Sequence, residues 1–407
     1  MTDKEFRDAA VAKFASELAH LRLTTRGLKS FTPPASSEWG KALKDRDDGL
    51  ALLAQIGAVV EPPPPPPPTG TLPATITAGG IYRGIREGQV LIRTDQPVVI
   101  EDFEVRYGGT GYAIDAQYPG AKALIRRGRF PNIGGTGQAI WSYGYDRIEI
   151  ENCEINGFWG IRLDNGRSGS ITKILRNKLR NQVFDEGTNG NGKWLSHPIQ
   201  TANTSSPGVL EIAWNECIGE FGKSNTEDMI SLYNSSYAKV HDNYCQGAYP
   251  KTLSGSSWSG NTKYSGGGII ADGPQANFNE LYDNIVVDTM NYCVAIAGGH
   301  DNKAYRNRAV CDSRNDQGQP FTAISSGGIG FYIADYSNSP SFVNNKLYDS
   351  VVGVIGTSGN RNDYWSPIAG AISGITTLPN PIDHQKELAE FQGWQQKVAA
   401  AGVKIGI

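Results

Sequence analysis

The chain has 407 residues, a formal net charge of −3 and 19% charged residues, with no basic stripe. Nucleic acid is therefore not an expected partner, and no apolar run approaches the ~18 residues that would predict a membrane span. The five cysteines are odd in number and form no Cys-x-x-Cys pair, so neither a disulfide framework nor a zinc site is predicted.

Residues 1–60 are predicted to form a small helical segment. Apolar side chains recur at helical spacing in residues 3–22, and again in a stretch that contains Trp39 and Leu43. Two such pieces are too small for a robust core of their own, so they are expected to pack on something else. The first residues also lack the apolar region of a secretory signal peptide.

A linker, residues 61–69, follows and contains seven consecutive prolines at 62–68. Such a run favours a polyproline II rod of about 3.1 Å per residue, or roughly 22 Å in all. The rod either holds a working module away from an anchor or is an ordinary domain linker.

Residues 70–377 repeat a short strand signal, typified by Ile148-Glu-Ile-Glu-Asn-Cys-Glu-Ile155, with a base period of about 25 residues. A second strand signal follows each copy, and no helical periodicity lies between copies. The pattern predicts an all-β, single-stranded parallel β-helix of about ten coils, with a stacked asparagine column of purely structural role. The marker positions are Asp102, Arg127, Asn152, Asn177, Asn215, Asn243, Asn284, Asn307 and Asn345.

Four insertions lengthen the connection between the two strand signals, at residues 181–197, 219–228, 247–267 and 312–328. Stacking of the coils should place them on one flank. They combine aromatic residues with many small polar ones, which suits carbohydrate, although some of the aromatics are expected only to pin the loops down. The predicted substrate-binding residues are Trp194, His197, Tyr249, Trp258, Lys263, Tyr264 and Arg314, with Asn234 nearby.

Carboxylates at the end of the second strand form the predicted cleft. When the three Ile-Ala-x segments are aligned, Asp272, Gly298 and Asp335 fall on successive coils, which separates the two carboxylates by roughly 9.6 Å. That is close to the ~6.5–9.5 Å of inverting glycosidases. Alternatively, each aspartate only stabilises a turn. The predicted catalytic set is Asp272, Asp335, Asp228, Glu227 and His300.

A lyase would need a base and often a cation. Lys251, Lys263 or Arg314 would serve as the base. Oxygen ligands for Ca²⁺ would come from Glu227, Asp228 and Asp272. No spacing makes this specific, so no cofactor beyond optional Ca²⁺ is expected.

The chain should end in a helix, because Leu388, Phe391, Trp394 and Val398 fall on one face of residues 378–402. An open β-helix end exposes strand edges, so residues 378–407 are expected to form a cap over it.

The body of the chain resembles the pectate-lyase-like right-handed β-helix superfamily. The resemblance rests on Glu-Asp-Met-Ile-Ser-Leu-Tyr at 227–233, Ser-Gly-Gly-Gly-Ile-Ile-Ala-Asp-Gly at 265–273 and Tyr-Cys-Val-Ala-Ile-Ala-Gly-Gly at 292–299. It implies a right-handed solenoid that binds or cleaves polysaccharide. The arginine motif of pectate lyases and the triple-aspartate signature of polygalacturonases are not found, so neither specificity is implied.

Residues 1–60 resemble the N-terminal segment of tail-associated proteins from phages of actinobacteria. The matching pieces are Glu-Phe-Arg-Asp-Ala-Ala-Val at 5–11, Leu-Thr-Thr at 23–25, Trp-Gly-Lys-Ala-Leu at 39–43 and Leu-Leu-Ala-Gln-Ile-Gly at 52–57, followed by the proline run. The resemblance implies virion tail proteins as partners of residues 1–60, a location in the virion tail and action outside the cell. A homotrimer, which many phage β-helices form, is one expected assembly.

These features support three hypotheses. The first is a phage tail spike or fibre protein that binds and depolymerises a host surface polysaccharide. The second is a glycan receptor-binding β-helix without enzymatic activity. The third is a bacterial polysaccharide lyase or glycoside hydrolase.

Overall fold

The computed structural model describes residues 69–131, 134, 137–183, 196–249, 266–321 and 328–407. The chain divides into two units, residues 1–66 and 67–407, and the boundary lies inside the proline run. The predicted helical segment of residues 1–60 lies outside the described residues.

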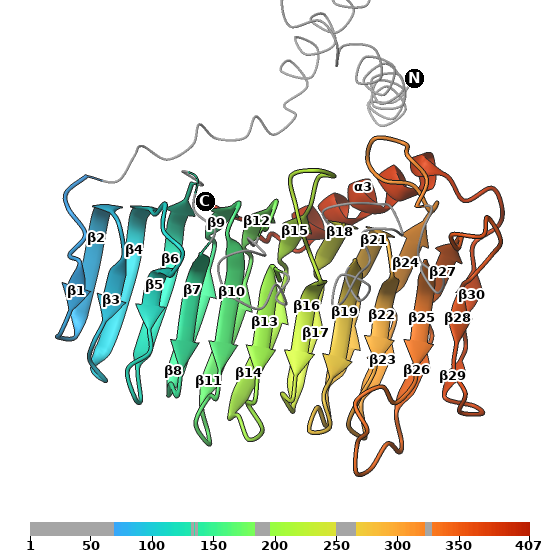
Figure 1. Cartoon of the computed structure of the whole chain (residues 1–407), viewed down its shortest axis with the longest axis horizontal. Helices are drawn as coiled ribbons and strands as arrows, with labels where there is room; N and C mark the ends of the chain where they lie inside the picture. Colours follow the sequence, from blue (N-terminus) through green and yellow to red (C-terminus); the bar gives the residue numbers. More distant parts are fainter. Residues whose placement is uncertain (1–68, 132–133, 135–136, 184–195, 250–265, 322–327) are drawn as a thin grey trace, which may run out of the picture. The chain divides into compact units, whose positions relative to one another are not determined.

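The second unit is a parallel β-helix, which confirms the predicted fold class (Figure 1). Eleven strands of the described part form one sheet, here called sheet 1, in which neighbouring strands run parallel. In chain order its strands are β1 (Thr75–Ile76), β3 (Val90–Ile92), β5 (Tyr112–Ala116), β7 (Gln138–Tyr143), β10 (Trp159–Asp164), β13 (Ile199–Ala202), β16 (Asp228–Tyr233), β19 (Gly267–Asp272), β22 (Tyr292–Ile296), β25 (Ile329–Ile333) and β28 (Tyr364–Trp365).

The other sheet, sheet 2, has nineteen strands in the described residues. It begins with three long strands, β2 (Gly80–Glu87), β4 (Pro97–Arg106) and β6 (Lys122–Phe130). Each later coil contributes two short strands in place of one long one. These are β8 (Arg147–Glu151) and β9 (Glu154–Asn156), β11 (Ile171–Leu175) and β12 (Lys178–Arg180), β14 (Val209–Ala213) and β15 (Glu216–Ile218), β17 (Ala238–His241) and β18 (Tyr244–Ala248), β20 (Glu280–Tyr282) and β21 (Ile285–Thr289), β23 (Lys303–Tyr305) and β24 (Arg308–Cys311), β26 (Lys346–Tyr348) and β27 (Val351–Val354), and β29 (Ile372–Ser373) and β30 (Thr376–Thr377).

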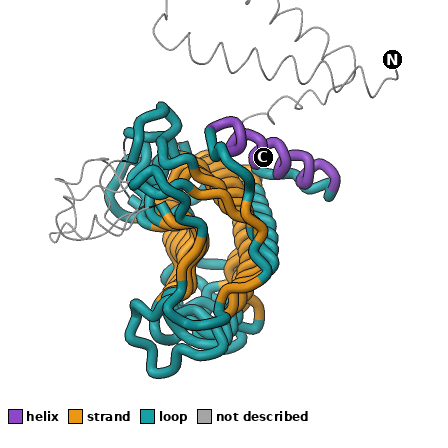
Figure 2. The backbone as a smooth tube through the Cα atoms, turned by 90° about the vertical axis from the view of Figure 1, so that its right-hand side faces the viewer, coloured by secondary structure: helices purple, strands orange, loops and turns teal. Residues whose placement is uncertain are grey.

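The two sheets face each other (Figure 2), and the buried apolar side chains of the core lie between them. Side chains alternate along each strand, so that in β10 Ile161 and Leu163 are fully buried in the core while Arg162 lies on the outer side. Because every coil repeats this alternation, apolar residues stack on apolar residues from one coil to the next. The hydrophobic effect thus fixes the coil register.

The short strand pairs of sheet 2 are separated by a bend with a left-handed residue. Asn152 has φ 51° and Arg176 has φ 58°, and strand pairing places them at the same level. The next residue supplies the stacked column, in which Asn177 Nδ2 donates to Asn215 Oδ1 at 2.9 Å. The column continues through Asn243, Asn284 and Asn307 and ends at Ser350.

The predicted asparagine stack is therefore confirmed, but its register needs two corrections. Asn152 is the left-handed residue, and Cys153 occupies the column position instead, donating its N–H to Asn177 Oδ1 at 2.9 Å. Asn345 belongs to a second, shorter column, where its Oδ1 accepts from Asn302 Nδ2 at 3.1 Å. The first error arises because an Asn can also occupy the left-handed position, one residue before the column, and the second because another bend of the coil is also marked by Asn.

We expect Asn243→Ala to lower the free energy of unfolding by about 3 kcal/mol, measured by chemical denaturation. Asn243 Oδ1 accepts from both the backbone N–H and the side-chain amide of Asn215, and its own amide donates to Ile212 O at 2.9 Å. The truncation leaves these buried donors and acceptors without hydrogen-bond partners. Asn156→Ala, at an exposed strand position, should change the stability by less than about 0.5 kcal/mol; equal effects would contradict a stabilising column.

The four insertions confirm the predicted flank. Each one leaves the second short strand of a pair in sheet 2 and enters a strand of sheet 1. The connections are β12 to β13, β15 to β16, β18 to β19 and β24 to β25. Parallel stacking then puts the ends of all four on the same side of the cylinder.

The C-terminal helix α3 (His384–Ala400) forms as predicted, but it does not cover the open end. It lies along the side of the β-helix (Figure 2), where Trp394 packs against Tyr244 and Ile285. The helix docks there because the outer face of sheet 2 carries two neighbouring apolar side chains. Tyr244 and Ile285 are apolar at a level where the coils on either side carry Glu216 and Arg308, so an apolar strip needs cover.

Cys217 and Cys245 face each other across β15 and β18, and all five cysteines are buried and free. No helix of the described residues is long and apolar enough to cross a membrane.

Candidate functional site

One row on the outer side of sheet 1 brings together residues from five coils. Ile161 pairs with Ile199, and Ile199 with Ile230, so two residues earlier Trp159, His197 and Asp228 stand at one level. The strict alternation is interrupted here, because Phe158 and Met229, adjacent to Trp159 and Asp228, are the core residues; Trp159 and Asp228 therefore lie on the outer side. Asp228 pairs with Gly267, and the pairing of the next strands puts Tyr292 beside Gly267. The row lies where the insertions re-enter sheet 1.

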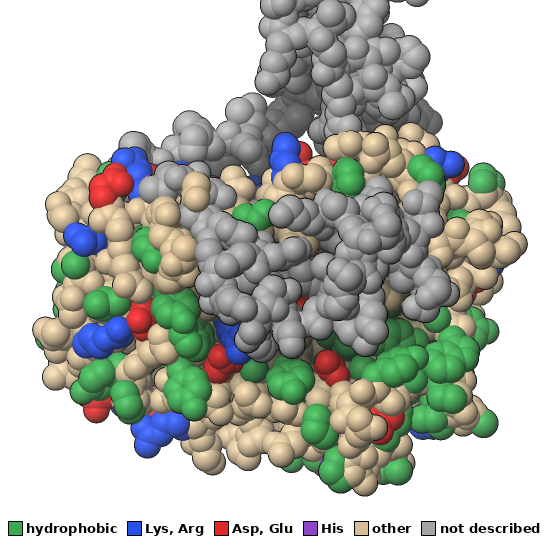
Figure 3. Space-filling view, in the orientation of Figure 1, with side chains coloured by type: hydrophobic (Ala, Val, Ile, Leu, Met, Phe, Trp, Pro, Cys, Tyr) green, Lys and Arg blue, Asp and Glu red, His purple; other side chains and the backbone are tan. Residues whose placement is uncertain are grey.

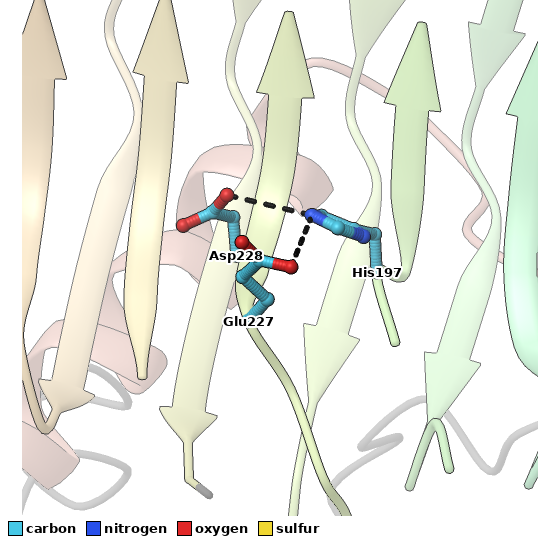
Figure 4. A group of neighbouring side chains, drawn as sticks. All are labelled: His197, Glu227 and Asp228. Carbon is cyan, nitrogen blue, oxygen red and sulfur yellow. Dashed lines mark ion pairs between the residues drawn. The ribbon is translucent and has the colours of Figure 1, made fainter. Parts of the chain in front are cut away.

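His197 and two carboxylates form the centre of this row (Figure 4). His197 Nε2 lies 3.4 Å from Asp228 Oδ2 and 3.8 Å from Glu227 Oε2. One donor atom from each of the three residues lies within 4.8 Å of the other two. Glu227 immediately precedes β16, and its backbone N–H donates to Ser196 O at 2.9 Å, which ties the ends of two insertions together.

The imidazole of His197 is held from behind by Trp159. The two rings are stacked, with centroids 6.2 Å apart and planes 29° from parallel. His197 is only 3% exposed, and its Nδ1 is buried without a hydrogen-bond partner in the described residues. With Nδ1 enclosed, Nε2 is the nitrogen that meets the carboxylates.

Asp228 is fixed on its other side by Tyr292. The Tyr292 hydroxyl donates to Asp228 Oδ1 across the intervening coil, where Gly267 leaves room. A Cβ at Gly267 would lie 2.4 Å from Asp228 Oδ1 and 2.5 Å from the Tyr292 oxygen, so any larger residue would break the contact. Burial raises the pKa of Tyr292 well above its usual value, which keeps the phenol a donor.

Glu227 has the most informative electrostatics of the group. Burial is the largest cause that raises the pKa of its carboxyl to about 7, and the negative charges of Asp228 and Asp272 raise it further, while His197 lowers it. Its side chain is still 32% exposed, unlike that of Asp228 at 11%. Glu227 is thus a carboxylic acid that can hold a proton near neutral pH and reach solvent or a ligand.

Asp272 lies at the end of β19 and belongs to the same electrostatic neighbourhood. Burial raises its pKa, and the charge of Asp228 adds to this, whereas hydrogen bonds from Ser337 and Gly273 lower it. Asp272 Oδ1 accepts from Ser337 Oγ at 2.5 Å and from Gly273 N at 2.6 Å. The carboxylate is therefore half-buried and already hydrogen-bonded.

The predicted alignment of Asp272 with Asp335 is off by one residue. Strand pairing sets Ala271 against Ile296 and Ile296 against Ile333, so Asp272 is level with Ala297 and Ala334. The repeated Ile-Ala dipeptide suggested the wrong register, because β19 carries an extra isoleucine.

Asp335 instead stabilises an exposed turn. Its Oδ1 accepts from the backbone N–H groups of Ser337 and Ser339, both at 3.1 Å. This agrees with the alternative prediction that the aspartate only stabilises a turn.

His300 and Asn234 also serve turns. His300 Nδ1 pairs with Asp301 at 2.7 Å, and its ring meets Phe278 edge-on. Asn234 has φ 51°, and its Oδ1 accepts from Gln275 N at 3.1 Å. Within the described residues, neither contacts the His197 cluster.

Among the predicted substrate-binding residues, the prediction for Tyr249 is wrong, because its ring is not available to stack on a sugar. It is 0% exposed, donates to Asp288 Oδ2 and packs against Phe321, so it pins an insertion in place. Arg314 is exposed, and its Nη1 donates to Gly318 O at 2.8 Å. Trp194, Lys251, Trp258, Lys263 and Tyr264 lie outside the described residues.

Apolar and aromatic side chains border the acidic cluster on the outer side of sheet 1. Ile270, Tyr292, Ala295 and Ala297 form a small cluster against which Tyr332 packs. Hydrophobic side chains accordingly gather on the right of the face in Figure 3. Exposed tyrosines adjoin them: Tyr233 is 43% exposed and pairs with Asp272, and Tyr336 is 66% exposed.

The donor set His197, Glu227 and Asp228 could hold a cation. An imidazole nitrogen with two carboxylates suits a transition metal or zinc better than Ca²⁺, which takes six to eight oxygen ligands. The predicted Ca²⁺ set of Glu227, Asp228 and Asp272 therefore omits His197, whose imidazole faces the first two carboxylates.

Trp159, Tyr292 and Ser337 are site residues that the sequence reasoning did not select. The coil period carries the signal for the first two, since counting back from the paired isoleucines puts both in the row of Asp228. No protein-family model matches the chain, and no curated protein sequence matches it.

Proposed function

We propose that the chain binds a polysaccharide along the outer face of sheet 1 and hydrolyses it at Glu227 and Asp228. The observation that carries the proposal is the pairing of a proton-holding carboxyl, Glu227, with a second carboxylate and His197 within 4.8 Å. Glycoside hydrolysis needs two carboxyl groups whose environments set different roles.

The spacing favours retention of anomeric configuration. Retaining enzymes place their carboxyl groups about 5–5.5 Å apart, whereas inverting enzymes leave ~6.5–9.5 Å for a water. The Glu227 and Asp228 oxygens, within 4.8 Å of each other, leave no such gap. Glu227 would donate its proton to the leaving glycosidic oxygen while Asp228 attacks the anomeric carbon. Water would then release the sugar from Asp228, returning its proton to Glu227.

The remaining groups would position these two. His197 Nε2 faces both carboxylates, and the Tyr292 hydroxyl holds Asp228 Oδ1. The exposed tyrosines beside the cluster offer flat apolar surfaces for sugar rings. The tyrosine surface also favours a second candidate function, a glycan receptor-binding module without catalysis. Sugar binding on tyrosine rings does not require the carboxyl groups of Glu227 and Asp228.

For the wider context we propose a tail spike or fibre of a phage particle that acts on a host surface glycan outside the cell. Residues 1–60 would attach the chain to the virion tail, and the proline run would act as the spacer. Support comes from the sequence resemblance and from the unit boundary inside the proline run.

Product analysis tests the proposal. Full-length protein is incubated with purified envelope polysaccharide of candidate hosts, and both reducing ends and ultraviolet-absorbing unsaturated ends are measured. New reducing ends without unsaturation support hydrolysis, and proton NMR of the first product reports retention or inversion. Unsaturated ends would replace the proposal with a lyase. Saturable binding without any new ends would replace it with a receptor-binding module.

We expect the rate to fall as the pH rises above about 7. The pKa of Glu227 is raised to about 7, so the acid form needed for proton donation predominates below that pH and is lost above it. Well above pH 7, kcat should drop about tenfold per pH unit. A pH–rate profile on a saturating glycan measures this; a rate that climbs steadily to pH 9 would contradict Glu227 as the acid.

A further inference from the structure

A second cluster of acidic groups lies away from sheet 1, where the first turn of α3 meets sheet 2. One donor atom each from Asp288 in β21, Cys311 in β24 and Glu387 in α3 lies within 4.8 Å of the others. The three residues are 1%, 0% and 3% exposed. They come from three segments that are far apart in sequence, so the cluster is made only when the helix docks.

The hydrogen bonds leave this cluster incomplete. Asp288 Oδ2 accepts from the Tyr249 hydroxyl, but Asp288 Oδ1 is buried without any hydrogen-bond partner in the described residues. Cys311 Sγ donates to Thr289 O at 3.3 Å. Glu387 Oε1 accepts from Asp312 N at 2.7 Å. An orphaned carboxylate oxygen on a residue this buried is rare and indicates a missing partner.

Charge compensation is also incomplete. Within the described part of the chain, no lysine or arginine forms an ion pair with Asp288 or Glu387; only His384 Nδ1 lies 3.1 Å from Glu387 Oε2. Charged groups buried this deeply are normally paired or bound to a metal. By contrast, Glu390 one turn later is paired with Arg308 at 2.6 Å.

We propose that this cluster is a binding site for a thiophilic divalent cation, Zn²⁺ in particular, held by Asp288, Cys311 and Glu387. A thiolate with two carboxylates suits zinc and disfavours Ca²⁺ and Mg²⁺, which take oxygen ligands. Tetrahedral zinc would bring the donor atoms to about 3.5 Å from one another, a small movement from their present separation. His384 is placed to orient Glu387 from outside the ligand set.

The consequence is a metal clasp between the helix and the β-helix. Two ligands sit on neighbouring strands of sheet 2 and the third on α3, so a bound ion would fasten the helix in place. Ligand binding to the docked state alone stabilises that state. This inference does not rest on the proposed function, because the cluster and the His197 site lie on different sheets.

The test uses full-length protein equilibrated with ZnCl₂ and freed of unbound metal, with zinc measured by mass spectrometry. His197→Ala serves as the background, because it removes the other donor set. We expect one equivalent of zinc in this background, and at least about a hundredfold weaker binding after Cys311→Ser or Glu387→Gln. Cys293→Ser and Glu390→Gln are the matched controls, a nearby buried thiol and a glutamate of the same helix, and should keep the zinc.

A spectroscopic readout keeps the test decisive if a variant folds poorly. Co²⁺ added to the His197→Ala protein should give a thiolate-to-cobalt charge-transfer absorption, which only a cysteine ligand produces. Cys311→Ser should remove this absorption. If Cys293→Ser removed it equally, Cys311 would not be the ligand and the proposed site would be overturned. Less than a tenth of an equivalent of zinc, together with no such absorption, would overturn the proposal outright.

Discussion

Glu227→Gln should reduce kcat for glycan hydrolysis by about 10²–10⁴-fold while leaving KM and the fold nearly unchanged. Glutamine keeps the size and hydrogen-bonding capacity of the side chain but cannot donate the proton. The substitution also leaves the backbone hydrogen bond from Glu227 N to Ser196 O untouched. The loss should be smaller on synthetic glycosides whose leaving groups need no protonation, since proton donation is then unnecessary.

A matched control is Glu280→Gln, on a short strand of sheet 2, where Glu280 Oε2 accepts from Tyr305 at 2.8 Å. It should keep full activity. Glu227→Gln with unchanged kcat would remove Glu227 from the mechanism, and an equal loss of glycan binding would make it a binding residue instead. If Asp272→Asn abolishes activity and Asp228→Asn does not, the second carboxylate is Asp272.

The fold was predictable because a solenoid repeats its signal. Buried isoleucines at fixed positions, as in Ile150, Ile174 and Ile212, recur at each coil whatever the loops do. The insertions could be located against that repeat, and so could the flank that carries His197, Glu227 and Asp228. The helical spacing of apolar residues likewise predicted α3, because this pattern lies within one short segment of the sequence.

The predictions that failed depended on strand register to within one residue, or on a contact with a residue far away in sequence. Asp272 and Asp335 both follow an Ile-Ala pair, yet the pairing of β19 with β22 shifts them apart by one residue. The docking place of α3 depends on two outward residues, Tyr244 and Ile285, that read as core in sequence. The contact between Asp228 and Tyr292 spans 64 residues and needs Gly267 between them. The coil period can place Tyr292 in the row of Asp228, but it does not reveal the hydrogen bond between them.

The docking of α3 leads to the largest expected effect on stability, which is that of Trp394→Ala. Trp394 is 1% exposed, its ring lies 5.6 Å from that of Tyr244, and its Nε1 donates to Asp242 O at 2.9 Å. Removing it should cost about 3–5 kcal/mol at this contact. Because α3 packs outside the main core, we expect the helix to detach while the coils stay folded.

Hydrogen exchange measures this directly. Amides of His384–Ala400 should exchange at least about a hundredfold faster in Trp394→Ala, whereas those of β16 and β19 should keep their protection. Gln395→Ala, on the exposed side of the same helix turn, should leave both unchanged. Loss of protection throughout the β-helix would mean that α3 and the coils fold as one unit. Unchanged protection in the helix would mean that the Arg308–Glu390 pair and the Asp288 cluster hold it without Trp394.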